Sequence, residues 1–206
     1  MSKEIIITLI IGILAGSLTC FFSQGGIANY KLFIRLTKTK GKWHKYRRIY
    51  ILLNIALSFY GLYIYGLSLT LIEFMLLISY LIAMAATDMR SRQVPDDATI
   101  FYGCLFIIIK IITFDIQIII NSLIAAVAGI VLPVAAYFIK NDSIGLGDIK
   151  LIACMGLTVG FPGIIYILAK SFFIGGIYAA VMLLRKKVTK DTELPMVPFI
   201  LLGAVI

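Results

Sequence analysis

The chain has 206 residues, of which 61% are hydrophobic and only 14% are charged, and its mean hydropathy is +1.03. Because soluble domains carry roughly a quarter charged residues, this composition excludes a soluble globular protein, and the scarcity of polar residues excludes a disordered one. Three cysteines are too few for a disulfide scaffold, and the net charge of +9 is spread between long apolar segments, so we expect no nucleic-acid binding.

Several segments are long and apolar enough to cross a bilayer, which takes about 20 mostly apolar residues. In chain order they are Ile5–Phe22, Ile49–Leu67, Leu69–Thr87, Ala98–Phe114, Ile116–Ile139, Ile149–Leu168 and Ser171–Leu184. The first lacks a clear small-x-small cleavage site, so we expect a retained helix rather than a signal peptide. An eighth stretch, Pro195–Ile206, is only about 18 Å long as a helix, so it is either half-inserted or cut short by an early chain end. The pattern predicts an all-α, polytopic integral membrane bundle of about seven to eight helices, formed by residues 1–206 as one domain.

The basic residues predict the orientation of this bundle. Eight of them lie in the loop that follows the first segment, within residues 25–48. If this loop is cytoplasmic and the segments alternate, only Lys3, Lys110 and Lys170 of the 19 Lys and Arg residues fall outside, which places the amino terminus outside. We expect the loop to lie against anionic lipid, with contact to a substrate or an assembly machine as the alternative. His44 in this loop has no apparent catalytic partner.

Two acidic residues lie at membrane boundaries where a charge is costly. Asp88 ends the third segment and Asp148 precedes the sixth, so the predicted topology places both on the cytoplasmic side at a similar depth. An ionisable residue at such a position indicates function. Two carboxylates that meet there tend to share one proton, which is the chemistry of an aspartic protease. Glu73, in contrast, begins the third segment near the outer surface, and we expect it to snorkel to the interface.

The residues around Asp148 suit this chemistry. Gly145 and Gly147 permit dihedral angles or close approaches that a Cβ atom would prevent. Asp148 is then expected at a helix start, where free N–H groups and the helix dipole favour an anion. A glycine-rich turn with an aspartate N-cap is the structural alternative.

The residues after Asp88 predict a turn. Pro95 restricts the residue before it to an extended conformation, and Asp96 or Asp97 is expected to cap the next helix. Arg90 and Arg92 first of all mark the cytoplasmic side, and they are also able to lower the pKa of a nearby aspartate.

Together, the two motifs resemble those of the type IV prepilin peptidases, membrane-embedded aspartic proteases of the Gly-x-Gly-Asp class. The first motif reads Asp88-Met-Arg-Ser-Arg-Gln-Val-Pro-Asp96, and the second reads Gly145-Leu-Gly-Asp-Ile-Lys-Leu151. Near the end of the chain, Pro195-Met-Val-Pro-Phe-Ile is similar to the family's Pro-x-x-Pro-Phe segment. Gly16-Ser17 is a weaker similarity. The resemblance covers most of the chain from about residue 70 onward.

The resemblance implies an activity. Prepilin peptidases cut the basic leader from type IV prepilins or pseudopilins at the cytoplasmic face of the bacterial inner or cytoplasmic membrane. It further implies that Asp88 and Asp148 are the catalytic pair, with acid and base roles unassigned. The supporting motif residues are Gly145, Gly147, Lys150, Arg90 and Pro95. The particular prepilin, its use in pili, secretion or DNA uptake, and the oligomeric state stay open.

The cysteines depart from the pattern of large family members, which carry paired Cys-x-x-Cys motifs suited to a metal in the first cytoplasmic loop. Here that loop has no cysteine, and Cys20, Cys104 and Cys154 fall within apolar segments, where we expect small buried hydrophobes. We therefore expect no structural zinc and a short form of the family. S-adenosylmethionine is expected as a cofactor only if the family's second activity, N-methylation of the new amino terminus, is retained.

Two other functions compete with the prepilin peptidase. A small ion or proton-coupled transporter also uses intramembrane acids, but it usually places them near the midplane, often with repeats or broken helices. A different Gly-x-Gly-Asp protease, such as a presenilin-like enzyme, does not account for the Arg- and Pro-containing first motif.

Overall fold

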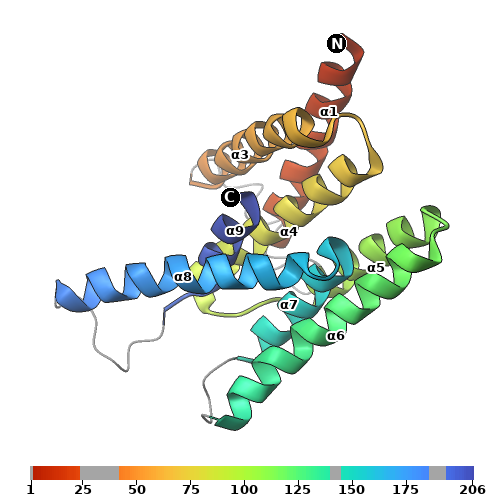
Figure 1. Ribbon diagram of the computed structural model, residues 1–206. Coiled ribbons are helices and arrows are strands. Elements are labelled where there is room, and N and C mark those ends of the chain that lie inside the picture. Colours follow the sequence, from red (N-terminus) through yellow and green to blue (C-terminus); the bar gives the residue numbers. More distant parts are fainter. Residues whose placement is uncertain (1, 24–41, 140–144, 186–193) are drawn as a thin grey trace.

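The computed structural model describes residues 2–23, 42–139, 145–185 and 194–206, and the regular elements in these ranges are all helices. They form a bundle (Figure 1), which confirms the predicted all-α class. The helices are α1 (Ser2–Phe22), α3 (Lys42–Tyr65), α4 (Leu69–Ser91), α5 (Asp96–Ile112), α6 (Ile116–Ile139), α7 (Leu146–Val159), α8 (Gly163–Leu184) and α9 (Val197–Val205).

Helix α4 is the centre of the bundle. It contacts α1 and α3 on one side and α5, α7 and α9 on the other. In Figure 1, α1 and α3 accordingly lie apart from α5, α6 and α7, with α4 between them. Tyr80, Leu81 and Met84 of α4 are fully buried, together with core residues of α5, α7 and α9. Because α4 is apolar on nearly all sides, it can be surrounded by other helices without exposing an unpaired polar face.

A chain of buried polar side chains also links the helices around α4. The hydroxyl groups of Ser79 and Tyr102 lie 2.7 Å apart, and the Ser79 hydroxyl lies 2.9 Å from that of Thr19. Asn54 of α3 donates from Nδ2 to Thr19 Oγ1 at 3.1 Å. Hydrogen bonds between small polar side chains are a common means of holding helices together in a membrane, and here they join α1, α3, α4 and α5.

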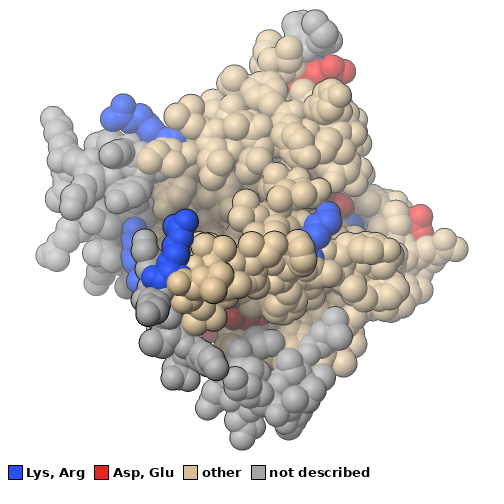
Figure 2. Space-filling view, turned by 60° about the vertical axis from the view of Figure 1, so that its left-hand side comes forward, with Lys and Arg blue, Asp and Glu red and all other residues tan. Residues whose placement is uncertain are grey.

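The outer surface of the bundle is apolar. Leu14 of α1 is 60% exposed and Phe173 of α8 is 71% exposed, and Figure 2 shows charged groups at only a few places on one face. Four of the described helices, within α1, α3, α4 and α8, are long and apolar enough to cross a bilayer. A helical bundle with this surface is a multi-pass membrane protein.

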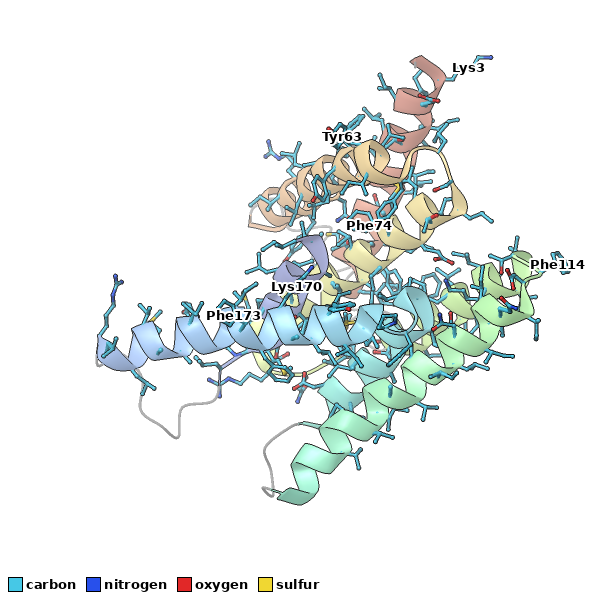
Figure 3. The ribbon with its side chains drawn as sticks, in the orientation of Figure 1. Lys3, Tyr63, Phe74, Phe114, Lys170 and Phe173 are labelled. Carbon is cyan, nitrogen blue, oxygen red and sulfur yellow. The ribbon has the colours of Figure 1, made fainter. Side chains whose placement is uncertain are left out.

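The two ends of the bundle are distinguished by the helix ends that lie there. We call the end at which α4 terminates and α5 and α7 begin the inner side, and the end that carries the α5–α6 connection the outer side. Phe114, in this connection, is 90% exposed at the tip of the bundle (Figure 3). The charge pattern of the sequence predicts that the inner side faces the cytoplasm.

The predicted break between the last two long segments is wrong. Helix α7 ends at Val159, and α8 runs without interruption from Gly163, so the predicted connection at Ala169–Lys170 lies inside a helix. Lys170 is exposed midway along α8 (Figure 3). The chain turns instead at Gly160, whose φ of +74° suits glycine, and Asn121 Oδ1 accepts a hydrogen bond from the Phe161 N–H at 2.6 Å.

Other local predictions are also corrected. Glu73 does not snorkel: its carboxylate forms an ion pair with Lys110 at 2.8 Å, and both side chains are only 11% exposed. Cys20 and Cys154 are buried as expected, but Cys104 is exposed on the surface of α5.

The second long helix, α3, begins at Lys42 rather than at Ile49. Residues 25–41 of the basic loop, and the side chains of residues 42–47 including His44, lie outside the described part of the structure.

Candidate active site

Helix α4 carries Asp88 to the inner side of the bundle. Asp88 lies in the last turn of this helix, and its side chain is buried, with 7% of the residue exposed. The helix ends at Arg92, which adopts a left-handed conformation and donates its N–H to the Asp88 carbonyl oxygen at 2.9 Å. A residue in the left-handed conformation is a common way to stop a helix. The position of the Asp88 backbone is therefore fixed by the most buried helix of the protein.

The carboxylate of Asp88 is held by the chain's last helix. Its Oδ2 atom accepts a hydrogen bond from the Val197 N–H at 3.0 Å. The backbone of Met196 contributes a further interaction with the same carboxyl group, and the charge of Arg92 acts on it as well. Burial opposes the ionised form of this carboxylate, and the donors and the cation around it favour that form.

Helix α7 brings Asp148 to the same side. Asp148 lies in the first turn of α7, where its N–H donates to the Gly145 carbonyl oxygen at 3.0 Å, and its side chain is half-buried. Burial and, as the smaller cause, the nearby Asp88 carboxylate together raise the pKa of Asp148 to about 6. The two predicted aspartates thus come from separate helices and lie close enough to influence each other's charge.

The two glycines before Asp148 differ in what they allow. A Cβ atom on Gly147 would lie 3.2 Å from Cβ of Val94, so this glycine permits the close approach that the sequence predicts. Gly145 is the N-cap of α7 with φ of −69°, which any residue adopts. A Cβ atom there would have its nearest neighbour, Oδ2 of Asp148, at an ordinary 3.9 Å. Gly147 therefore joins the two motifs sterically, whereas neither conformation nor space requires a glycine at Gly145.

Lys150 and Asp96 form a second link between the motifs. Their Nζ and Oδ1 atoms lie 2.8 Å apart, and both side chains are about half exposed or more, at 52% and 65%. Pro95, not an aspartate, is the N-cap of α5, which corrects the predicted capping role of Asp96.

The remaining predicted residues near Asp88 play smaller parts. Asp97 accepts the Ala98 N–H at 2.8 Å, which satisfies one donor in the first turn of α5. Arg90 is exposed, and the arginine charge that acts on Asp88 belongs to Arg92.

The surface beside this ion pair is hollowed into a groove of about 510 Å³ between α5, α6 and α7. It begins at Asp96 and Lys150, and its walls further along are small or apolar, including Gly103, Ala126 and Ala153. An apolar segment lying in this groove would have one end beside Lys150, which is two residues after Asp148 in the chain. Within the described ranges, no three His, Cys, Asp or Glu residues are grouped so that they could hold a metal ion.

Sequence reasoning did not find the Val197 N–H as part of the site. A backbone N–H group cannot be recognised from residue types. The sequence feature that marks its location is the Pro195-Met-Val-Pro-Phe segment, to which the sequence alone assigned no role. The two aspartates were predicted to lie together because the alternation of membrane-crossing segments and the distribution of Lys and Arg residues place both on the same side of the membrane.

Comparisons with known proteins agree with these features. The model of the type IV leader peptidase family matches residues 75–180, which include both aspartates and more than half of the chain. A curated relative, the prepilin leader peptidase/N-methyltransferase of Bacillus subtilis (strain 168), is 30% identical over 146 residues. This match covers 69% of the present chain but 57% of the relative, so the chain spans little more than half of the relative's length. No solved structure is significantly similar. The chain belongs to the type IV leader peptidase family.

Proposed function

We propose that this protein is an intramembrane aspartic endopeptidase that cuts the basic leader from a type IV prepilin or pseudopilin at the cytoplasmic face of a bacterial inner or cytoplasmic membrane. The observation that carries the proposal is the electrostatic interaction of Asp88 with Asp148 at the inner side, where burial raises the pKa of Asp148 to about 6. A carboxyl group with such a pKa is able to hold a proton beside an ionised partner, as the reaction requires.

The reaction needs one ionised and one protonated carboxyl group. The carboxylate takes a proton from a water molecule while the oxygen of that water attacks the scissile carbonyl carbon. The protonated partner donates its proton to the carbonyl oxygen. The tetrahedral intermediate then collapses, the C–N bond breaks, and the amine leaves with a proton from the carboxyl group that took it from water. As the intermediate collapses, one of its hydroxyl groups returns a proton to the carboxyl group that donated to the carbonyl oxygen. The pair therefore ends with one ionised and one protonated carboxyl group, and no cofactor is consumed.

Two further observations support a prepilin-like substrate. The relative from Bacillus subtilis is named a prepilin leader peptidase, and prepilins carry a basic leader ahead of an apolar helix. The apolar groove that begins at Asp96 and Lys150 suits a substrate whose apolar segment starts next to the bond that is cut. Anionic lipids around the basic loop are a second proposed partner.

The test is cleavage of a prepilin by the purified protein in detergent or lipid. Asp88→Asn and Asp148→Asn each abolish cleavage while the protein still inserts and purifies. Asp115→Asn is the matched control, because Asp115 lies at the outer side and accepts the backbone N–H groups of Gln117 and Ile118. Mass analysis of the product gives the cut site, and a 14-Da increase with S-adenosylmethionine present would reveal N-methylation. Full activity of either Asp88→Asn or Asp148→Asn would contradict the proposal.

A further inference from the structure

The segment Pro195–Phe199 meets Asp88 through its backbone. The Val197 N–H donates to Oδ2 of Asp88 at 3.0 Å, and Val197 itself is fully buried. In the described part of α9 and the residues just before it, no side chain carries a charge. What this segment offers to the aspartate is therefore a peptide dipole and no counter-ion.

The position of Val197 in its helix explains why this N–H is available. Val197 is the first residue of α9, and the first N–H groups of a helix have no acceptor within it. Pro198 follows, which has no N–H and whose fixed φ suits the first turn. The helix dipole adds positive potential at this end, so the N-terminus of α9 favours the ionised carboxylate.

Close packing against α8 fixes where α9 presents this donor. A Cβ atom on Gly203 would lie 2.8 Å from the Ile167 carbonyl oxygen and would also collide with the Ser171 hydroxyl. A Cβ atom on Gly175 would lie 3.3 Å from the ring of Phe199. Helix α9 therefore has little freedom to slide along α8 and carry Val197 away from Asp88.

The surroundings of the two aspartates are unequal. Asp88 faces the Val197 donor from α9, Arg92 from the end of its own helix, and Asp148 from α7. Among the described residues, nothing donates a hydrogen bond to the carboxyl group of Asp148, which faces the Asp88 charge and is half-buried. When one proton is shared by such a pair, it resides on the partner without donors.

We propose that Val197 is a positioning residue whose N–H holds Asp88 as the ionised base, which leaves Asp148 as the proton-bearing acid. This assignment rests on the proposed peptidase function and deepens it. It also gives the Pro-x-x-Pro-Phe segment a role: Pro198 stops the neighbouring backbone position from donating, and Phe199 anchors the segment on α8 through Gly175.

The test replaces Val197 by its α-hydroxy analogue, so that an ester oxygen takes the place of the N–H while the side chain is kept. Because hydrogen bonds to charged groups contribute about 1.5–3 kcal/mol, we expect kcat for a prepilin substrate to fall about tenfold or more, with KM within about twofold. The acid limb of the rate–pH profile moves to higher pH, whereas the alkaline limb, set by Asp148, stays in place.

Two controls separate positioning from folding. The same ester at Ile200 removes a bond within α9, since the Ile200 N–H donates to the Met196 carbonyl oxygen at 3.2 Å, but leaves the Val197 donor intact. Gly175→Leu pushes on Phe199 and lowers kcat, whereas Gly176→Leu, where a side chain meets nothing within 4 Å, leaves it unchanged.

The outcomes distinguish the two proposals. If the wild type cleaves, Asp88→Asn is inactive, and the Val197 ester keeps full kcat and an unshifted profile, the positioning role is overturned and the peptidase stands. An Ile200 ester with the same kinetic defect as the Val197 ester also overturns it. If the wild type cleaves no prepilin at all, the failure is that of the proposed function.

Discussion

The Nζ atom of Lys150 lies 2.8 Å from Oδ1 of Asp96, which ties the chain segment after Asp88 to the helix that carries Asp148. Gly147 makes a second tie within one helical turn of the first, because it lies directly against Val94 of the same segment. The distance between the two aspartates is thus set by contacts between their flanking residues, and these contacts can be altered without touching the aspartates.

The ion pair itself is expected to contribute modestly. Because both side chains are largely exposed, the pair stabilises the arrangement by at most about 1 kcal/mol, so Lys150→Met is expected to lower kcat/KM by no more than about fivefold. Asp96→Asn has the same effect, and the exchange Lys150→Asp with Asp96→Lys restores part of the loss. A double-mutant cycle on cleavage rates measures the coupling. A loss beyond about a hundredfold in Lys150→Met would mean that the lysine acts on the substrate directly.

The two glycines of the second motif are expected to behave differently. Gly147→Ala forces Val94 away, because the new Cβ atom would lie 3.2 Å from the Val94 Cβ atom, and we expect cleavage to fall about tenfold. Gly145→Ala places a methyl group at ordinary contact distance in an ordinary conformation, so its activity stays within about threefold of the wild type. Initial cleavage rates of the two variants at matched protein levels check this. Equal defects would show that Gly145 serves the substrate rather than the fold.

The outline of the fold and the pair of aspartates were predictable because both depend on long-range regularities of sequence. No charge interrupts residues 116–139, so the bounds of α6 were found without error. The alternation of helices, with basic residues on one side, then placed Asp88 and Asp148 together. These predictions require only the hydropathy and charge of each segment and the alternation of the segments across the membrane.

The features that were missed depend on local geometry or on partners far apart in sequence. The break at Gly160 was missed because residues 151–168 carry no charge, and Lys170 looked like a boundary. The partner of Glu73, Lys110, is 37 residues away, and nothing in either segment marks the pairing. The Val197 donor is a backbone group, which residue types do not reveal.

The Glu73–Lys110 pair is expected to matter for stability and not for cleavage. Removing one partner of a mostly buried pair leaves the other charge uncompensated, although the pair lines a partly open cavity of about 470 Å³, which reduces the cost. We expect Glu73→Gln to lower the free energy of unfolding by about 1–3 kcal/mol, and Glu73→Gln with Lys110→Met to recover part of it. Thermal unfolding in detergent measures both.

Cleavage by these variants serves as the control. Fifteen residues of α4 separate Glu73 from Asp88, which is about 22 Å along a helix, so kcat and KM at a permissive temperature stay unchanged. A selective loss of cleavage in a thermally stable Glu73→Gln protein would contradict the separation of the pair from the site.

Asp148 is expected to reduce stability at neutral pH, and the sign follows from its pKa. The value of about 6 in the folded protein lies above the ordinary value of 3.8, so the folded state binds more protons than the unfolded state between these values. Stability therefore falls as pH rises from about 4 to about 6 and stays lower above that range.

Asp148→Asn removes this loss, and it also relieves Asp88 of a neighbouring charge. Because Asp148 is only half-buried, we discount the gain to about 1 kcal/mol at pH 8, or about 2–4 °C in Tm. The difference from the wild type vanishes near pH 4. An Asp148→Asn protein that unfolds at a lower temperature than the wild type at pH 8 would show that the carboxylate has stabilising partners, and it would remove the reason to regard Asp148 as the proton-bearing member of the pair.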